Sequence, residues 1–222
     1  YGVELNFGYN GSERFARHER YGFFPAAGIT WNVANEPFWG NLKQVVDKLK
    51  FKVTYGLVGN DAISDSRFFY MSDVNMNDTN KSVWYGTNFA VSRPGITVLR
   101  YSNNDITWEI ARKLNIGTEI RLFDKVELQV DYFTEDRSNI LMDRTNLPSS
   151  MGLEATVKAN VGRAASRGVD ASLDYQHSFS KDLWITARAN FTYATSEFFV
   201  ADEPADAAAG LPWRSRTGYR LL

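Results

Sequence analysis

Residues 114–134 read LNIGTEIRLFDKVELQVDYFT, and this stretch decides the fold. Its apolar side chains recur at every second position, namely Leu114, Ile116, Ile120, Leu122, Val126, Leu128, Val130 and Tyr132. A period of two is typical of β-strands whose two faces meet different surroundings. The stretch therefore predicts two antiparallel strands joined by a tight turn at Asp124–Lys125.

The same alternation recurs along the rest of the chain. It predicts seven strands, near residues 1–10, 22–34, 50–58, 108–123, 125–135, 167–178 and 182–195. Most of them span about 9–11 residues, which is the length that a tilted strand needs to cross a bilayer. Helical periodicity is nearly absent, and only residues 41–49 fit one or two helical turns. The predicted fold class is therefore all-β and antiparallel.

Composition excludes several classes of protein. The chain has 222 residues, with 25 Lys and Arg against 26 Asp and Glu, so it lacks the basic excess of a nucleic-acid-binding protein. It has no cysteine and two histidines, which argues against disulfides, thiolate sites and histidine metal clusters. We predict no cofactor, no metal and no nucleic-acid partner. A hydrophobic content of 44% excludes a disordered chain.

The connections between the predicted strands are of two kinds. Asp124–Lys125 and Ser180–Lys181 form tight turns, whereas long loops are expected near residues 59–107, 136–166 and 196–222. Bacterial outer-membrane barrels have short periplasmic turns and long extracellular loops, so the pattern predicts part of a transmembrane antiparallel β-barrel. Seven strands cannot close a barrel that needs an even number. Because the chain also opens at Tyr1 within an alternating segment, we expect an internal fragment of a longer protein.

The first long loop contains two weakly alternating runs, residues 83–91 and 96–101. The parity of membrane crossings allows them to be either a hairpin within the loop or an extra pair of crossing strands. We favour the hairpin. In the second arrangement, Pro94 and Gly95 would form the tight turn.

The polar faces of the predicted strands suggest residues that line a barrel interior. These candidates are Glu119, Arg121, Glu127, Asp131, Asp170, Asp174 and Arg188. In a soluble sheet the same residues would form a solvated face. Glu127 and Asp131 lie roughly 13 Å apart along one strand, which exceeds the spacing of about 5–9.5 Å in paired-carboxylate catalytic sites. We therefore predict no enzyme activity.

Aromatic residues suggest two further groups of candidates. An interfacial belt at the level of the lipid headgroups would consist of Trp31, Phe123, Phe179, Phe191 and Tyr193. In contrast, Phe133 and Trp184 fall on the polar side of their strands. Loop aromatics that contact a ligand or a partner, or alternatively pack the loop itself, are Phe68, Phe69, Tyr70, Trp84 and Tyr85. Asp61, Asp65, Asp73 and Asp78 in the same loop are compatible with calcium, but their spacing matches no EF-hand and we favour a solvated polar loop.

Several segments together resemble a known family. They are residues 24–31 (FPAAGITW), 49–56 (LKFKVTYG), 59–60, 108–109, 115–117, 131–133, 137–141, 147–148, 160–162 and 167–170. In order and spacing they are similar to the barrel of SusC/RagA-type TonB-dependent outer-membrane transporters of Bacteroidetes-type bacteria. The resemblance covers roughly residues 1–200.

The resemblance implies a large plugged barrel of about 22 strands in the bacterial outer membrane, of which this chain supplies about seven. It implies nutrient uptake of oligosaccharide or peptide, with outer-membrane lipid and a SusD-like surface lipoprotein as partners. A TonB complex would act through an N-terminal segment, and we expect that segment and the plug domain to be absent here. The alternatives are a soluble β-rich binding module or adhesin, and a passive porin.

Overall fold

Nine strands make up most of the computed structural model, which describes residues 1–204 and 211–220. The strands are β1 (Gly2–Gly11), β2 (Tyr21–Asn32), β3 (Val46–Asn60), β4 (Asp73–Tyr85), β5 (Val91–Arg100), β6 (Glu109–Leu122), β7 (Val126–Asp143), β8 (Lys158–Ser178) and β9 (Trp184–Val200). Four short 3₁₀ helices accompany them, namely η1 (Val33–Asn35), η2 (Pro37–Gln44), η3 (Ser149–Met151) and η4 (Pro212–Arg214). Among the described residues, none of the helices has the length and apolar character required to cross a membrane.

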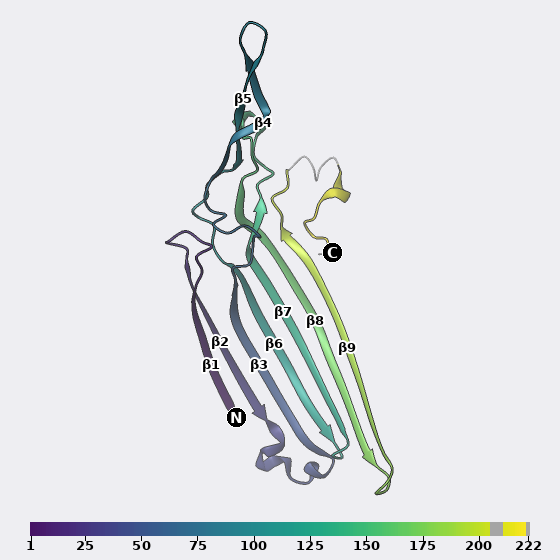
Figure 1. The fold of residues 1–222 in the computed structure, drawn as a ribbon. Helices are drawn as coiled ribbons and strands as arrows, with labels where there is room; N and C mark the ends of the chain where they lie inside the picture. Colours follow the sequence, from purple (N-terminus) through teal and green to yellow (C-terminus); the bar gives the residue numbers. More distant parts are fainter. Residues whose placement is uncertain (205–210, 221–222) are drawn as a thin grey trace.

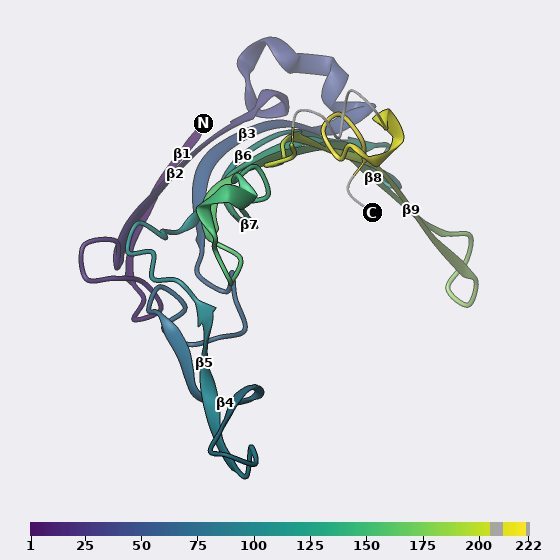
Figure 2. The same ribbon diagram turned by 90° about the horizontal axis from the view of Figure 1, so that it is seen from above.

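Seven strands form one antiparallel sheet in the order β1-β2-β3-β6-β7-β8-β9 (Figure 1). The predicted all-β antiparallel class is thereby confirmed. Seen from above, the sheet is strongly curved and open, with β1 and β9 at its two edges (Figure 2). An open, curved sheet of this kind is consistent with one part of a barrel wall.

The connections differ in length between the two ends of the sheet, except that 33–45 at one end is longer than 12–20 at the other (Figure 1). One end holds η1 and η2 together with the tight turns after β6 and β8, which include Asp124–Lys125 and Ser180–Lys181. The opposite end holds the connections 12–20, 61–108 and 144–157. We call these the short-turn end and the loop end.

The strands at the loop end run further than the alternation predicted. The β7–β8 ladder continues to the pair Asp143↔Lys158, after a register shift between Arg137 and Ile140. Asn139 has a φ of 59° inside this irregular region. Backbone pairing needs no apolar side chains, so a ladder continues where the alternating pattern has faded.

A hairpin is present in the first long connection, as predicted, and forms a separate two-stranded sheet of β4 and β5. Its strands are not the predicted runs 83–91 and 96–101, because residues 86–90 form its turn. The hairpin turn lies between Tyr85 and Val91, where Gly86 has a φ of 90°. Pro94 and Gly95, the turn of the alternative arrangement, lie inside β5 instead. They lie opposite an irregular stretch of β4, where the register shifts between Asp78 and Val83.

A small hydrophobic core lies at the loop end. Its buried members are Phe15, Phe24, Phe69, Ile106 and Trp108. The ring centroids of Phe24 and Trp108 are 5.3 Å apart, and those of Phe15 and Trp108 are 5.2 Å apart. Three separate segments, 12–20, β2 and 61–108, thus pack together through one aromatic cluster.

Gly59 makes room for this cluster, and Gly59→Ala tests that role. A Cβ atom at position 59 would lie 2.0 Å from Cζ of Phe24. We expect the substitution to destabilise the full-length protein by about 1–3 kcal/mol through overpacking. The measurement is denaturant unfolding in detergent, with Gly8→Ala as control because its Cβ would meet nothing nearer than 3.4 Å. Equal stability of the two variants would contradict this packing.

Candidate functional site

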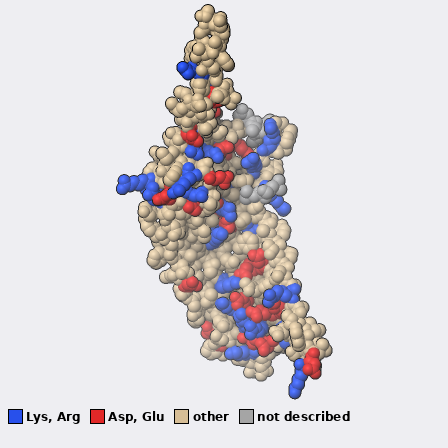
Figure 3. All heavy atoms as spheres, in the orientation of Figure 1, with Lys and Arg blue, Asp and Glu red and all other residues tan. Residues whose placement is uncertain are grey.

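The sheet has one charged face and one apolar face. The concave side of the curved sheet (Figure 2) carries acidic and basic side chains, and Figure 3 shows one group of them toward the short-turn end and another at the loop end. The charged cluster comes from three neighbouring strands and consists of Asp47, Lys48, Lys50, Lys52, Glu119, Arg121, Glu127 and Asp131. We call the face that holds it the polar face.

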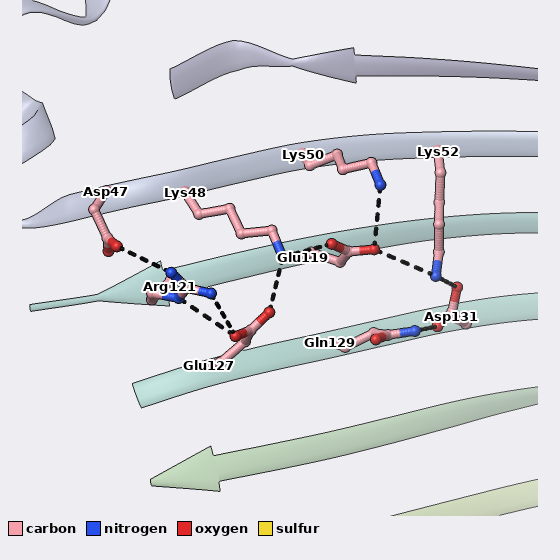
Figure 4. A network of polar contacts seen from close by, with 9 residues as sticks. All are labelled: Asp47, Lys48, Lys50, Lys52, Glu119, Arg121, Glu127, Gln129 and Asp131. Atoms are coloured by element: carbon pink, nitrogen blue, oxygen red, sulfur yellow. Dashed lines mark hydrogen bonds and ion pairs between the residues drawn. The ribbon is translucent and has the colours of Figure 1, made fainter. Parts of the chain in front are cut away.

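Lys48 lies at the centre of this cluster (Figure 4). Its Nζ is 2.9 Å from Oε2 of Glu119 and 2.8 Å from Oε1 of Glu127. Arg121 donates from Nη2 to Oε2 of Glu127 at 3.0 Å, and its Nη1 lies 3.8 Å from Asp47. The carboxylates of adjacent strands are therefore joined through shared cations rather than facing one another.

Asp131 is a second centre of the cluster. Nζ of Lys52 lies 2.9 Å from Oδ1 of Asp131, and Gln129 donates to Oδ2 at 2.7 Å. Gly117 lies between these strands, and a Cβ there would be 2.1 Å from Oδ1 of Asp131 and 2.3 Å from Cε of Lys52. With Asp131 only 8% exposed, glycine at position 117 is what allows the buried carboxylate to meet its lysine.

Two further strands extend the polar face. Asp174 on β8 pairs with Arg188 on β9. Asp170 lies directly opposite Asp131 in the ladder, and its side chain makes no ion pair in the described part of the chain. All seven predicted interior residues thus lie on this one face. Sequence reasoning missed Lys48, Lys50 and Lys52, although their alternation with Leu49, Phe51 and Val53 marks the same face.

This arrangement suits a lining surface more than a reactive centre. Glu119, Glu127 and Asp131 all have cationic partners within 3 Å. Carboxylates held in ion pairs are already engaged by their cationic partners. Among the described residues, no three Asp, Glu or His side chains come together as a metal site. The polar face is therefore able to bind and orient polar groups by hydrogen bonds and charge.

Phe133 and Trp184 are aromatic exceptions on the polar side of their strands. The Phe133 ring covers Gly168, where a Cβ would lie 2.5 Å from Cζ of Phe133. Trp184 is 66% exposed at the start of β9. Phe133 therefore packs within the sheet, whereas the exposed Trp184 side chain is able to contact another surface.

The opposite face, here called the apolar face, exposes large hydrophobic side chains on all seven strands. They include Val3, Leu5, Phe7, Ile29, Trp31, Phe51, Val53, Tyr55, Ile116, Tyr132, Leu173, Phe191 and Tyr193. Phe7, for example, is 77% exposed. A contiguous apolar patch that covers a whole sheet face is rare on proteins surrounded by water. Of the predicted interfacial residues, Trp31, Phe191 and Tyr193 lie on this face. Phe123 and Phe179 lie in the turns at the short-turn end.

The predicted loop contacts separate into two groups. Phe69 is 4% exposed and belongs to the aromatic core, which agrees with the packing alternative. Phe68 and Tyr70 flank it, and the Arg67 guanidinium lies 4.9 Å from the Phe68 ring centroid. Trp84 and Tyr85 are more than half exposed on the β4–β5 hairpin, which projects beyond the sheet (Figure 1).

Carboxylates in the loops hold local structure. Asp78 accepts a hydrogen bond from the Thr97 hydroxyl across the hairpin, and this bond lowers the pKa of Asp78. At the far end of the chain, burial raises the pKa of Glu203, but hydrogen bonds from the Arg216 amide and the Ser215 hydroxyl outweigh it. The pKa of Glu203 therefore lies below its usual value.

Comparison with known proteins identifies the family. A profile of the family described as TonB dependent receptor-like, beta-barrel, matches residues 1–221. The chain belongs to the TonB-dependent receptor β-barrel family.

Relatives of this TonB-dependent receptor segment include members of the predicted type. TonB-dependent receptor P3 of Formosa agariphila is 27% identical over 188 residues, which is 80% of this chain and 17% of that protein. TonB-dependent receptor SusC of Bacteroides thetaiotaomicron is 24% identical over 192 residues, or 85% of this chain and 18% of SusC. The chain thus spans less than a fifth of these relatives.

Solved structures share the fold. The RagAB peptide importer in the 'open-open' state superposes with a TM-score of 0.73 at 22% identity, over 90% of this chain and 20% of that chain. The 'closed-closed' state gives 0.70 at 23% identity, over 88% and 20% respectively. The resemblance to the SusC/RagA family is confirmed.

The central ion pair of the receptor segment is open to a double-mutant cycle. With Lys48→Met and Glu127→Gln in the full-length protein, we expect a coupling free energy of about 1–3 kcal/mol in unfolding experiments, because the two groups are in contact and partly buried. The control is the pair Asp143–Lys158, which is 3.7 Å apart with both side chains more than half exposed. Its coupling should stay below about 0.5 kcal/mol. Additive effects at Lys48 and Glu127 would show that the network contributes no cooperativity.

Proposed function

We propose that this chain forms part of the barrel wall of an outer-membrane receptor that imports nutrients, oligosaccharide or peptide, with energy from a TonB complex. The single observation that carries the proposal is the two-faced curved sheet. Its convex side is a continuous exposed apolar surface, and its concave side carries paired charges. A barrel wall between lipid and a polar interior requires this division.

The dimensions of the apolar face support a membrane location. In β3, Leu49 and Leu57 mark the ends of the alternating apolar series, with Leu57 partly buried against the aromatic core, and eight residue steps correspond to about 27 Å along the strand. A tilt of about 40° reduces the height to about 21 Å, within a few ångströms of the apolar band of about 25 Å in such barrels.

The sorting of the connections supports an orientation. We assign the short-turn end to the periplasm and the loop end to the exterior, as is usual for bacterial barrels. The charged network then lies near the periplasmic end of the interior. Glu119, Arg121, Glu127, Asp131, Asp170, Asp174 and Arg188 are proposed to line that interior.

The loop end is the proposed place for external contacts. The exposed aromatics Trp84 and Tyr85 on the projecting hairpin are suited to stack on sugar rings or to fill a pocket of a SusD-like lipoprotein. Phe68 and Tyr70 are second candidates at the base of the hairpin. Buried Phe69 is left out of the proposed contact surface. Contact with TonB is proposed for the N-terminal part of the whole receptor.

Two alternative functions, a soluble binding module and a passive porin, predict different properties for the same surfaces. A soluble β-rich binding module would need other protein to cover the apolar face on all seven strands. A passive porin would keep the same wall but would transport without TonB. The charged interior is compatible with either kind of transport, so energy dependence decides between them.

The first test concerns the apolar face. Val53 lies midway between Leu49 and Leu57 and is 42% exposed. If it faces the bilayer centre, Val53→Arg should destabilise the full-length protein in lipid vesicles by about 2–4 kcal/mol. Thr54→Arg changes the adjacent, exposed residue of the opposite face and should cost less than about 1 kcal/mol. Equal effects would overturn the membrane orientation.

The second test concerns transport. Uptake of labelled oligosaccharides and peptides should fall to background when the full-length gene is deleted, and equally when TonB is removed. The measurement is accumulation by whole cells over a panel of both substrate classes. Uptake that needs the gene but persists without TonB would favour the porin, and recovery of the full-length protein in the soluble fraction would favour the binding module.

A further inference from the structure

Arginines collect on the apolar face just beyond its hydrophobic part. In the ladder, Tyr132, Val169 and Tyr193 form the last apolar row toward the loop end. The next row on this face is Leu114, Thr134, Arg167 and Thr195, and the row after it is Arg112, Asp136, Ala165 and Glu197. The surface therefore changes from apolar to cationic within a few residues along β8.

A cleft accompanies this change. It has a volume of about 470 Å³, and its lining includes Tyr132, Thr134, Arg167, Thr195, Phe199 and Arg220. The lining combines the rings of Tyr132 and Phe199 with hydroxyl, guanidinium and carboxylate groups, the last from Glu135, Asp136 and Glu197. An occupant that matches both the rings and the polar groups must itself be amphipathic.

The charges around the cleft are unevenly paired. Asp136 accepts hydrogen bonds from Arg163, with Nε–Oδ1 at 3.1 Å, and Arg163 also lies 5.9 Å from the Phe199 ring centroid. The Arg167 side chain has no ion pair or hydrogen bond among residues 1–204 and 211–220, and it is exposed. Three carboxylates line the cleft, on Glu135, Asp136 and Glu197, and the first two are already paired, with Arg137 and Arg163. The rows and the cleft add three further guanidinium groups, on Arg112, Arg167 and Arg220, of which Arg167 and Arg220 line the cleft.

We infer that this cleft binds the phosphate-bearing headgroup of a lipid in the outer leaflet. The inference rests on the proposed orientation of the sheet, which places the cleft at the level of the outer-leaflet headgroups. Arg167 and Arg112 donate to the phosphate, because a guanidinium matches phosphate oxygens in a bidentate geometry. Thr134 and Thr195, which flank Arg167 in the ladder, add hydroxyl donors. The acyl chains lie on the apolar face beside Tyr132 and Tyr193.

The position of the cationic patch favours a lipid over a free anion or a protein. The patch is continuous with a broad exposed apolar surface, and a free phosphate ion would make no contact with that surface. An acidic protein segment would have to displace lipid from Tyr132 and Tyr193 to reach Arg167. Basic residues at the border of a membrane surface are the usual means of binding anionic headgroups.

The test is lipid binding to the full-length receptor in detergent, followed by native mass spectrometry. The probe is a bis-phosphorylated glucosamine lipid of bacterial outer leaflets, with its enzymatically dephosphorylated form as comparison. Arg167→Gln should weaken binding about tenfold, and the double substitution with Arg112→Gln about a hundredfold. The dephosphorylated lipid should bind the unaltered protein as weakly as the double variant binds the phosphorylated one. Arg93→Gln is the control, because it removes one exposed positive charge from β5, outside the cleft.

Each outcome bears on one claim. Equal affinity of the unaltered protein and the double variant, with both folded by circular dichroism, would overturn the lipid site. Competition by inorganic phosphate at the same concentration as the lipid would show a free-anion site and would also overturn it. Failure of the membrane orientation itself would appear separately, as a harmless Val53→Arg substitution.

Discussion

The alternation of side chains along paired antiparallel strands is the constraint on which the rest of the structure depends. Neighbouring residues of one strand must satisfy different surroundings. Lys52 reaches the buried Asp131, whereas Val53 next to it belongs to the exposed apolar face. Because a shift of one residue exchanges the two faces, the ladder pair Lys52↔Gly117 fixes both of them at once.

The charged network and this register support one another. Lys48 bridges Glu119 and Glu127 on two other strands, and it can do so only when β3, β6 and β7 are paired as observed. A partly buried charge that loses its partner is costly, so alternative registers leave unpaired charges on this face. Gly117 adds a steric condition, since any side chain there would collide with Asp131 and Lys52.

Much of the sheet was predictable because a period of two is a local property of the sequence. The charged cluster was only half predictable. The strand was expected to begin at residue 50, which left Lys48 outside it, although β3 begins at Val46. The partners of the three lysines also depend on which strands become neighbours.

The burial of Phe69 could not be predicted from the local sequence, because Phe15 and Trp108 contact it from other segments of the chain. Pro94 and Gly95 have the usual composition of a turn, but pairing across an irregular β4 places them inside a strand.

The polar side of the sheet changes character along its length. Toward the short-turn end it is ionic, with charges that are paired in place, and ion pairs continue toward the loop end as Lys113–Glu135 and Arg137–Glu109. Toward the loop end, Phe24 continues the same side of β2 by alternation, and the connections fold back to bury it against Trp108. A chain that only needed a solvated face would have no reason to enclose aromatic rings there. The enclosed core instead anchors the long connections to the sheet, so the projecting hairpin with Trp84 and Tyr85 is held from a fixed base. For the importer proposed above, this division places the proposed contact surface outside the wall.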